Sequence, residues 1–204
     1  VTFAVVNTYN NVNASNRNPV AIYVDTSYIY VSCITATKRQ VELSRVNRTT
    51  AAVNIITIGP SDAFAAHNYY KGSIVATPAA AGLDGALYVM MDNNFKACGE
   101  VARVKVWDSA TSVPAFTLTD TLTTTYAFSF RAGCYYSGYV YVPVIYSGAH
   151  QTLGGLTSYC SGVAQIDIVA PYAVTFIPVN VPVGTHGNQF IMNIVEQDAY
   201  LYML

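Results

Sequence analysis

A short strand centred on a tyrosine recurs four times along this 204-residue chain, and the repeat limits the fold more than any other feature. Tyr30, Tyr88, Tyr141 and Tyr202 hold the same place in copies spaced about fifty to sixty residues apart. Each copy follows a turn that is rich in Gly, Asp or Ser. A period of this length is typical of folds built from one repeated supersecondary unit.

Three further strand patterns accompany the tyrosine strand in a fixed order. One precedes it, and it covers residues 20–24, 73–77, 126–131 and 189–194. A second follows it, and it aligns residues 38–46 with 98–106 and 160–168. A third comes last, and it aligns residues 52–58 with 115–119 and 174–179. We name these strand types A, B (the tyrosine strand), C and D, and the opening residues 1–7 match the D strand at 174–180.

Four antiparallel strands per repeat predict an all-β fold made of β-propeller blades. We interpret residues 1–204 as one propeller segment of about three and a half blades, which belongs to a larger ring or to a ring completed by another copy. The segment divides into strand D of a preceding blade (1–7), three blades (20–58, 73–119 and 126–179) and the start of a fourth (189–204). The alternative is a β-sandwich or jelly roll whose strands resemble one another by coincidence.

The stretch Val104-Lys105-Val106-Trp107-Asp108 carries a family resemblance. It resembles the WD40 and quinoprotein-like propeller repeats, which often end strand C with a Trp-Asp pair before a turn. Asn47 and Val169 are expected to replace Trp107 in the other units. The Gly-His dipeptide of WD repeats has no counterpart here, so the resemblance implies a propeller superfamily and no particular function.

Composition favours an exported or surface protein. Charged residues make up only 10% of the chain, against about 25% in ordinary soluble domains, and the net charge is −1. Nothing in this balance points to a nucleic acid or to an anionic membrane surface. Asn13 and Asn47 begin N-x-S/T sequons in predicted loops. We therefore expect an extracellular protein, or one on the surface of a cell or virion, that is glycosylated at these two positions.

The long loops of the predicted blades collect the candidate contact residues at one face. The D-to-A and B-to-C connections are long, whereas the A-to-B and C-to-D turns are mostly short. Long loops on a rigid scaffold commonly carry binding sites, and tyrosine offers stacking area together with a hydroxyl. The candidate binding residues on this face are His67, Tyr69, Tyr70, Tyr146, His150, Tyr159 and His186. The four motif tyrosines are assigned instead to packing between blades.

No cofactor is expected, although three weaker chemical interpretations stay open. The three histidines would suffice as zinc ligands, but they come from different loops and lack a neighbouring carboxylate. Ser61 and Asp62 lie near His67, outside any nucleophile elbow. Asp62 and the run Asp92-Asn93-Asn94 could offer oxygen ligands to calcium. The favoured interpretation is that these are ordinary loop residues, and a calcium site stays the alternative.

The four cysteines show no metal-binding spacing. Cys33, Cys98 and Cys160 are expected at the long-loop ends of their strands, and Cys134 in an A-to-B turn at the opposite end. A seven-residue strand spans about 23 Å, which exceeds the reach of a disulfide. Disulfide bonding is expected in an exported chain of this kind, but a Cys134–Cys160 bond is not.

The favoured functional hypothesis is a non-catalytic module for adhesion, recognition or assembly, which contacts a protein, a glycan or further copies of itself. One alternative is a propeller enzyme of the metal-assisted hydrolase or lactonase type. Another is a structural subunit of a virion or filament. The chain has no apolar stretch of the length that a membrane helix requires.

Overall fold

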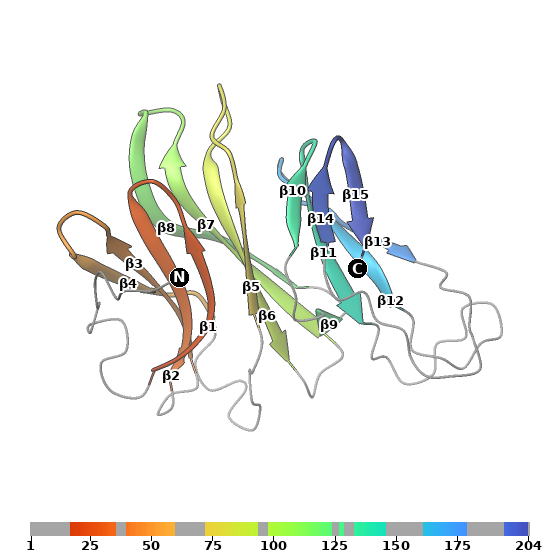
Figure 1. Cartoon of the computed structure of the whole chain (residues 1–204), viewed down its shortest axis with the longest axis horizontal. Coiled ribbons are helices and arrows are strands. Elements are labelled where there is room, and N and C mark those ends of the chain that lie inside the picture. The colour runs from red at the N-terminus through yellow and green to blue at the C-terminus, as the bar shows by residue number, and fades with distance from the viewer. Residues whose placement is uncertain are drawn as a thin grey trace, which may run out of the picture. The chain divides into compact units, whose positions relative to one another are not determined.

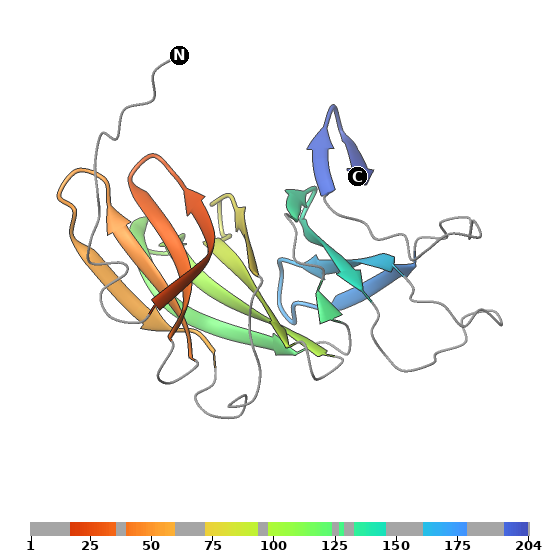
Figure 2. The ribbon, with the colours of Figure 1, turned by 60° about the horizontal axis from the view of Figure 1, so that its bottom comes forward.

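The computed structural model describes residues 17–35, 40–59, 72–93, 98–123, 127–128, 133–145, 161–178 and 194–203. All regular secondary structure in these ranges is β-strand, as the sequence predicts. Figures 1 and 2 show the strands grouped into separate antiparallel sheets. The chain forms two compact units, Val1–Ala65 and Ala66–Leu204.

Three sheets and one hairpin follow each other along the sequence. The first sheet has the order β1 (Arg17–Val24), β2 (Tyr28–Thr35), β3 (Val41–Asn47), β4 (Val53–Thr57). The second sheet has the order β5 (Gly72–Thr77), β6 (Gly85–Asn93), β7 (Cys98–Asp108), β8 (Val113–Thr123). The third has the order β10 (Cys134–Tyr136), β11 (Tyr139–Ile145), β12 (Ser161–Asp167), β13 (Val174–Pro178), and β9 (Ala127–Phe128) also pairs with β11. The terminal hairpin consists of β14 (Ile194–Gln197) and β15 (Tyr200–Met203).

The predicted order of four strand types is therefore confirmed in three sheets, with one change in the third. There the A strand is interrupted, because β9 pairs with Val144 and Ile145 whereas β10 pairs with residues 139–141. Cys134 consequently lies in a strand, and its placement in a turn was wrong. The A strand of the hairpin runs from Ile194 to Gln197, later than predicted, and residues 189–193 and 1–7 lie outside the described residues.

The predicted alignment of the C strands is wrong by two residues in the first sheet. Tyr30 pairs with Arg45, Tyr88 with Arg103 and Tyr141 with Gln165. The true equivalents of Arg45 are therefore Arg103 and Gln165. Side chains alternate along a strand with a period of two, so a slip of two residues leaves every side chain on its expected face and escapes a sequence comparison.

The short turns of each sheet are fixed by local backbone chemistry. The third sheet and the hairpin use two-residue turns, Ser137 with Gly138 and Asp198 with Ala199, and all four residues have positive φ. Such turns follow the twist of the adjoining strands. At the C-to-D turn of each of the three sheets, an Asn or Asp side chain caps the end of strand C. Its Oδ1 accepts backbone N–H groups from the following loop. The capping residues are Asn47, Asp108 and Asp167.

The Asp of the Trp-Asp pair, Asp108, thus has counterparts in the other two sheets, Asn47 and Asp167. Asn47 corresponds to Asp108 and not to Trp107, so the substitution expected at Trp107 was assigned to the wrong residue. The second sheet reaches its cap later, because β7 is longer and contains bulges on the way to Trp107, which stands opposite Gly85.

Within residues 66–204, successive sheets pack face to face. We call the side of each sheet that carries the motif tyrosine its tyrosine face and the other side its aliphatic face. The tyrosine face of the second sheet shares one core with the aliphatic face of the third, and this core includes Tyr88, Val101, Val140, Val142 and Ile166. The tyrosine face of the third sheet, through Cys134, Tyr141 and Val163, packs on Ile194 and Leu201 of the hairpin. The same orientation is thus used twice in succession.

Candidate functional site

The most unusual group in the described part of the chain is a buried arginine at the centre of the second sheet. Arg103 is only 4% exposed and pairs with Tyr88 on strand β6 and with Asp120 on strand β8. Its Nη1 donates to Thr119 Oγ1 at 2.8 Å and lies 3.7 Å from Asp120 Oδ2. A buried guanidinium is tolerated only when charge and hydrogen-bond partners surround it, and these residues supply both.

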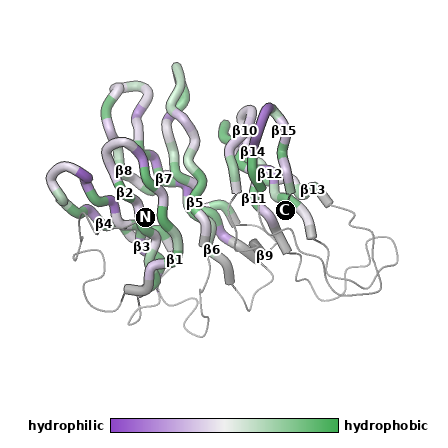
Figure 3. The backbone as a smooth tube through the Cα atoms, viewed as in Figure 1, coloured by the Kyte–Doolittle hydropathy of each residue, from purple (hydrophilic) through white to green (hydrophobic). Residues whose placement is uncertain are grey.

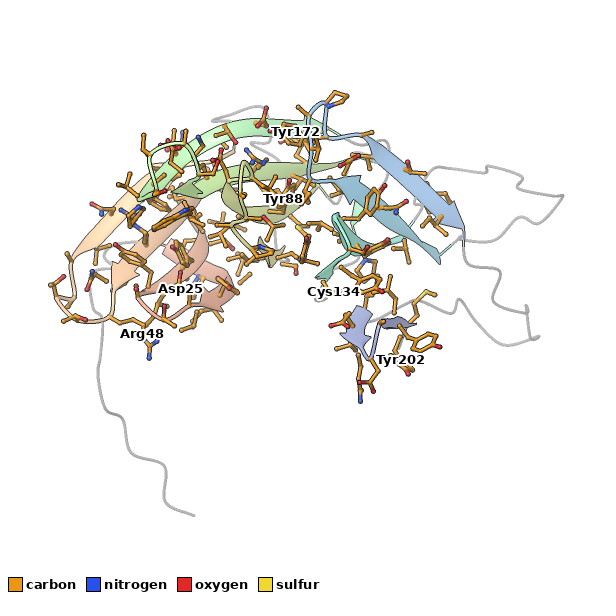
Figure 4. The ribbon with its side chains drawn as sticks, turned by 90° about the horizontal axis from the view of Figure 1, so that it is seen from above. Asp25, Arg48, Tyr88, Cys134, Tyr172 and Tyr202 are labelled. Atoms are coloured by element: carbon orange, nitrogen blue, oxygen red, sulfur yellow. The ribbon has the colours of Figure 1, made fainter. Side chains whose placement is uncertain are left out.

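An aromatic ring from the third sheet completes this environment. The Arg103 guanidinium lies 4.8 Å from the centroid of the Tyr172 ring, which comes from the turn between β12 and β13. Figure 4 labels Tyr88 and Tyr172. Tyr172 holds a positive φ of 56°, a backbone state uncommon for a bulky side chain. The cation–π contact thus links the tyrosine face of one sheet to the turn of the next.

Burial also perturbs the motif tyrosine of the second sheet. Tyr88 is fully buried, and this burial raises its pKa to about 12, an effect that the neighbouring Arg103 partly offsets. Among the described residues its hydroxyl has no hydrogen-bond partner of acceptable geometry, and neither has Arg103 Nε. The Tyr88 phenol therefore stays protonated at neutral pH.

The other sheets use the same positions with different chemistry. In the first sheet Arg45 stacks on Tyr28 at 4.7 Å, and Tyr30 is 1% exposed, with its pKa raised by burial and by Asp25. In the third sheet Gln165 replaces arginine, and its Nε2 donates to the Tyr141 hydroxyl at 3.1 Å. In each of the three sheets, the motif tyrosine therefore faces an arginine or a glutamine on strand C.

Each sheet also joins its two turns. The first and third share a backbone bond for this, from the Arg48 N–H to the Ser27 carbonyl in the first sheet, and the first and second add side-chain contacts. Arg48 Nη1 donates to the carbonyl oxygens of Asp25 and Thr26 in the first sheet (Figure 4 labels Asp25 and Arg48). In the second, Asp84 accepts from the Ser109 N–H and from Lys105, at 2.8 and 2.9 Å, and the Ser109 N–H and Lys105 lower the pKa of Asp84 to about 2. In the third, the backbone N–H of Ile168 donates to the Gly138 carbonyl. These contacts rigidify the short-turn end of each sheet.

Cys134 is the described thiol closest to the terminal hairpin. It carries no disulfide, and burial together with Glu196 raises its pKa. A raised pKa keeps the thiol protonated and poorly nucleophilic. This cysteine therefore acts as a small apolar residue in the core between the third sheet and the hairpin.

The candidate binding residues of the long loops fall outside the described residues. This applies to His67, Tyr69, Tyr70, Tyr146, His150, Tyr159 and His186, and also to Ser61, Asp62, Asn94, Asn13 and Cys160. Their role as binding residues stays a prediction. Asp92 and Asn93 close strand β6, where they pair with Gly99 and Cys98.

Asn47 is the one predicted glycosylation position that the structure describes. It is the last residue of β3, and its Oδ1 accepts from the N–H groups of Thr49 and Thr50 at 2.9 Å. Among residues whose positions are described, no three His, Cys, Asp or Glu side chains gather as a metal site would require. The same part of the chain holds no helix of the length and apolarity needed to cross a membrane.

Sequence reasoning placed the motif tyrosines in the scaffold but overlooked their arginine partners. Tyr30 and Tyr88 are buried as predicted, whereas Tyr202 is 46% exposed. The missed signal was the arginine in strand C that faces the motif tyrosine. This pairing becomes visible only in the correct strand register. The sequence alignment of the C strands placed Arg45 two residues away from its equivalent, Arg103.

No known family profile matches this chain, and no curated protein matches its sequence at a significant level.

Proposed function

We propose that this chain is a non-catalytic propeller-type module that recognises or assembles with surface partners outside the cell or on a virion. The observation that carries the proposal is the use of the polar groups in the described sheets. Arg103, Asp84 and Asn47 are each engaged in joining strands or turns of the scaffold. Because these polar side chains already bind other parts of the sheets, the sheets are best suited to act as a scaffold that presents the loops.

The repeated topology supports the propeller arrangement. Three sheets share the strand order A-B-C-D, and the second, the third and the hairpin pack in one consistent orientation. Blades of a propeller pack in this way, each on the next. The turn contacts made by Arg48, Asp84 and Ile168 occupy the short-turn end of each sheet. We assign partner binding to the opposite end, where the long loops emerge.

A binding experiment on a panel of immobilised surface glycans and purified surface proteins tests this assignment. The triple variant Tyr69→Ala, Tyr70→Ala and His150→Ala should lose roughly tenfold or more in affinity for whichever probe the unaltered chain binds. The control triple variant Thr26→Ala, Thr111→Ala and Val169→Ala alters exposed residues at the short-turn end and should bind normally. Unchanged binding by the first variant, or lost binding by the control, would overturn the assignment.

A further inference from the structure

The terminal hairpin packs on the third sheet with part of one face, on which Met203 stays 49% exposed, and its other face is exposed. Its aliphatic face packs on the third sheet, and Ile194 is only 2% exposed there. Its tyrosine face carries Val195, Tyr200 and Tyr202, which are 42%, 68% and 46% exposed. Figure 4 shows Tyr202 and Cys134 on opposite sides of the hairpin, and Figure 3 shows hydrophobic colour at the start of β14 and hydrophilic colour toward its turn.

The same positions in the second sheet are buried. Val195 pairs with Tyr202 just as Val75 pairs with Tyr88, yet Val75 and Tyr88 are 4% and 0% exposed. They are covered because the tyrosine face of the second sheet lies on the aliphatic face of the third. The exposed face of the hairpin therefore has the side chains that this repeat buries against the aliphatic face of another sheet.

The aliphatic face of the first sheet is exposed along its two outer strands, β1 and β4. Ile22, Val24 and Ile55 lie on it and are 66%, 49% and 37% exposed. Ile55 pairs with Ser44 in the register where Phe176 pairs with Ala164, and Phe176 packs into the core between the second and third sheets. The first sheet thus presents, along its outer strands, the type of surface that receives a tyrosine face elsewhere in the chain. The inner-strand residues of the same face are buried, with exposed fractions of 1%, 0% and 1% for Cys33, Ser44 and Val46.

We propose that the tyrosine face of the hairpin docks on the aliphatic face of the first sheet of a second copy of this chain. The inference deepens the proposed function, on whose repeat arrangement it rests, by naming a partner for assembly. The two surfaces differ, so the contact is head-to-tail and produces a closed ring or an open filament. A two-stranded hairpin is marginal by itself, and covering its second face stabilises it.

Sedimentation velocity on the whole chain, from low micromolar to several hundred micromolar, tests the contact. The unaltered chain should show a sedimentation coefficient that rises with concentration. Tyr202→Lys blocks the hairpin face and Ile22→Lys blocks the first sheet, and each should weaken association roughly tenfold or more. Val169→Lys is the matched control, because Val169 is 59% exposed on a turn and lies on neither face.

Mixing the two blocked variants gives the sharpest result. The Tyr202→Lys chain keeps an intact first sheet and the Ile22→Lys chain keeps an intact hairpin, so the mixture should form one-to-one dimers while each variant alone stays monomeric. Circular dichroism confirms that both variants are folded. A monomeric unaltered chain, a failure of the mixture to dimerise, or weaker association in Val169→Lys would overturn the proposal. The triple variant of Tyr69, Tyr70 and His150 leaves both docking faces intact. A failure of the proposed glycan or protein binding would therefore be distinguished from a failure of self-association.

Discussion

The second and third sheets have the same strand order but organise their centres differently. In the second, the position opposite the motif tyrosine holds a charge, Arg103, balanced by Asp120 and stacked on Tyr172. In the third, the neutral Gln165 takes that position and donates to Tyr141. The charged centre depends on several partners at once, including one from the next sheet. Among the described residues, the neutral centre depends on the hydrogen bond from Gln165 to Tyr141. Sheets of one topology can therefore differ greatly in their sensitivity to a single substitution.

The largest expected effect comes from removing the buried charge. Arg103→Ala should lower the free energy of unfolding by about 3 kcal/mol, because it leaves a cavity and deprives Thr119, Asp120 and Tyr172 of their shared partner. Gln165→Ala, the equivalent change in the third sheet, should cost about 1 kcal/mol. Urea unfolding followed by circular dichroism measures both. Equal losses would show that the charged centre has no special weight.

A second pair of variants compares the tyrosine hydroxyls. Tyr141→Phe removes the acceptor of the Gln165 amide and should cost about 1 kcal/mol. Tyr88→Phe removes a buried hydroxyl that has no hydrogen-bond partner in the described part of the chain, so it should be neutral or slightly stabilising. The difference is read from thermal midpoints measured under one set of conditions. A loss in Tyr88→Phe as large as that in Tyr141→Phe would mean that the Tyr88 hydroxyl makes a favourable contact with Arg103.

This contrast also shows what the sequence could and could not reveal. The tyrosine repeat was sufficient to predict an all-β chain and most strand positions, because each B strand follows a recognisable turn and alternates in polarity. The pairing of Tyr88 with Arg103 was not readable, because the register between strands depends on turn geometry and bulges. Here the register shifts run from Arg103 to Trp107, and the first of them leaves Thr119 of β8 as the extra residue.

The interruption between β9 and β10 had a similar cause. A side chain at Gly133 would press on the carbonyl oxygen of Tyr141 and approach Val75 of the second sheet at 3.1 Å. The chain at Gly133 thus approaches both the neighbouring strand of its own sheet and the second sheet, and local propensity gives no sign of these tertiary contacts. The long-loop residues, from His67 to His186, remain sequence predictions, because their placement lies outside the described residues.

The smallest expected effect concerns the tie between the turns of the second sheet, and it depends on pH. The Ser109 N–H and Lys105 lower the pKa of Asp84 from 3.8 to about 2. A depressed folded-state pKa stabilises the fold above the unfolded value, and this contribution is lost as the pH falls from about 4 toward 2. Asp84→Asn should therefore lower stability slightly at neutral pH and reduce the further loss of stability in that acid range.

Asp198→Asn is the matched control, because Asp198 is an exposed turn residue with positive φ, a state that asparagine also tolerates. The measurement is the urea midpoint at intervals between pH 2 and 7, at low salt. The effect should be modest, because the Asp84 and Lys105 side chains are 21% and 25% exposed and solvent screens their pairing. An acid profile for Asp84→Asn that matches those of the unaltered chain and of Asp198→Asn would show that the turns are held by their backbone alone, as the Ile168 N–H holds the third sheet to Gly138.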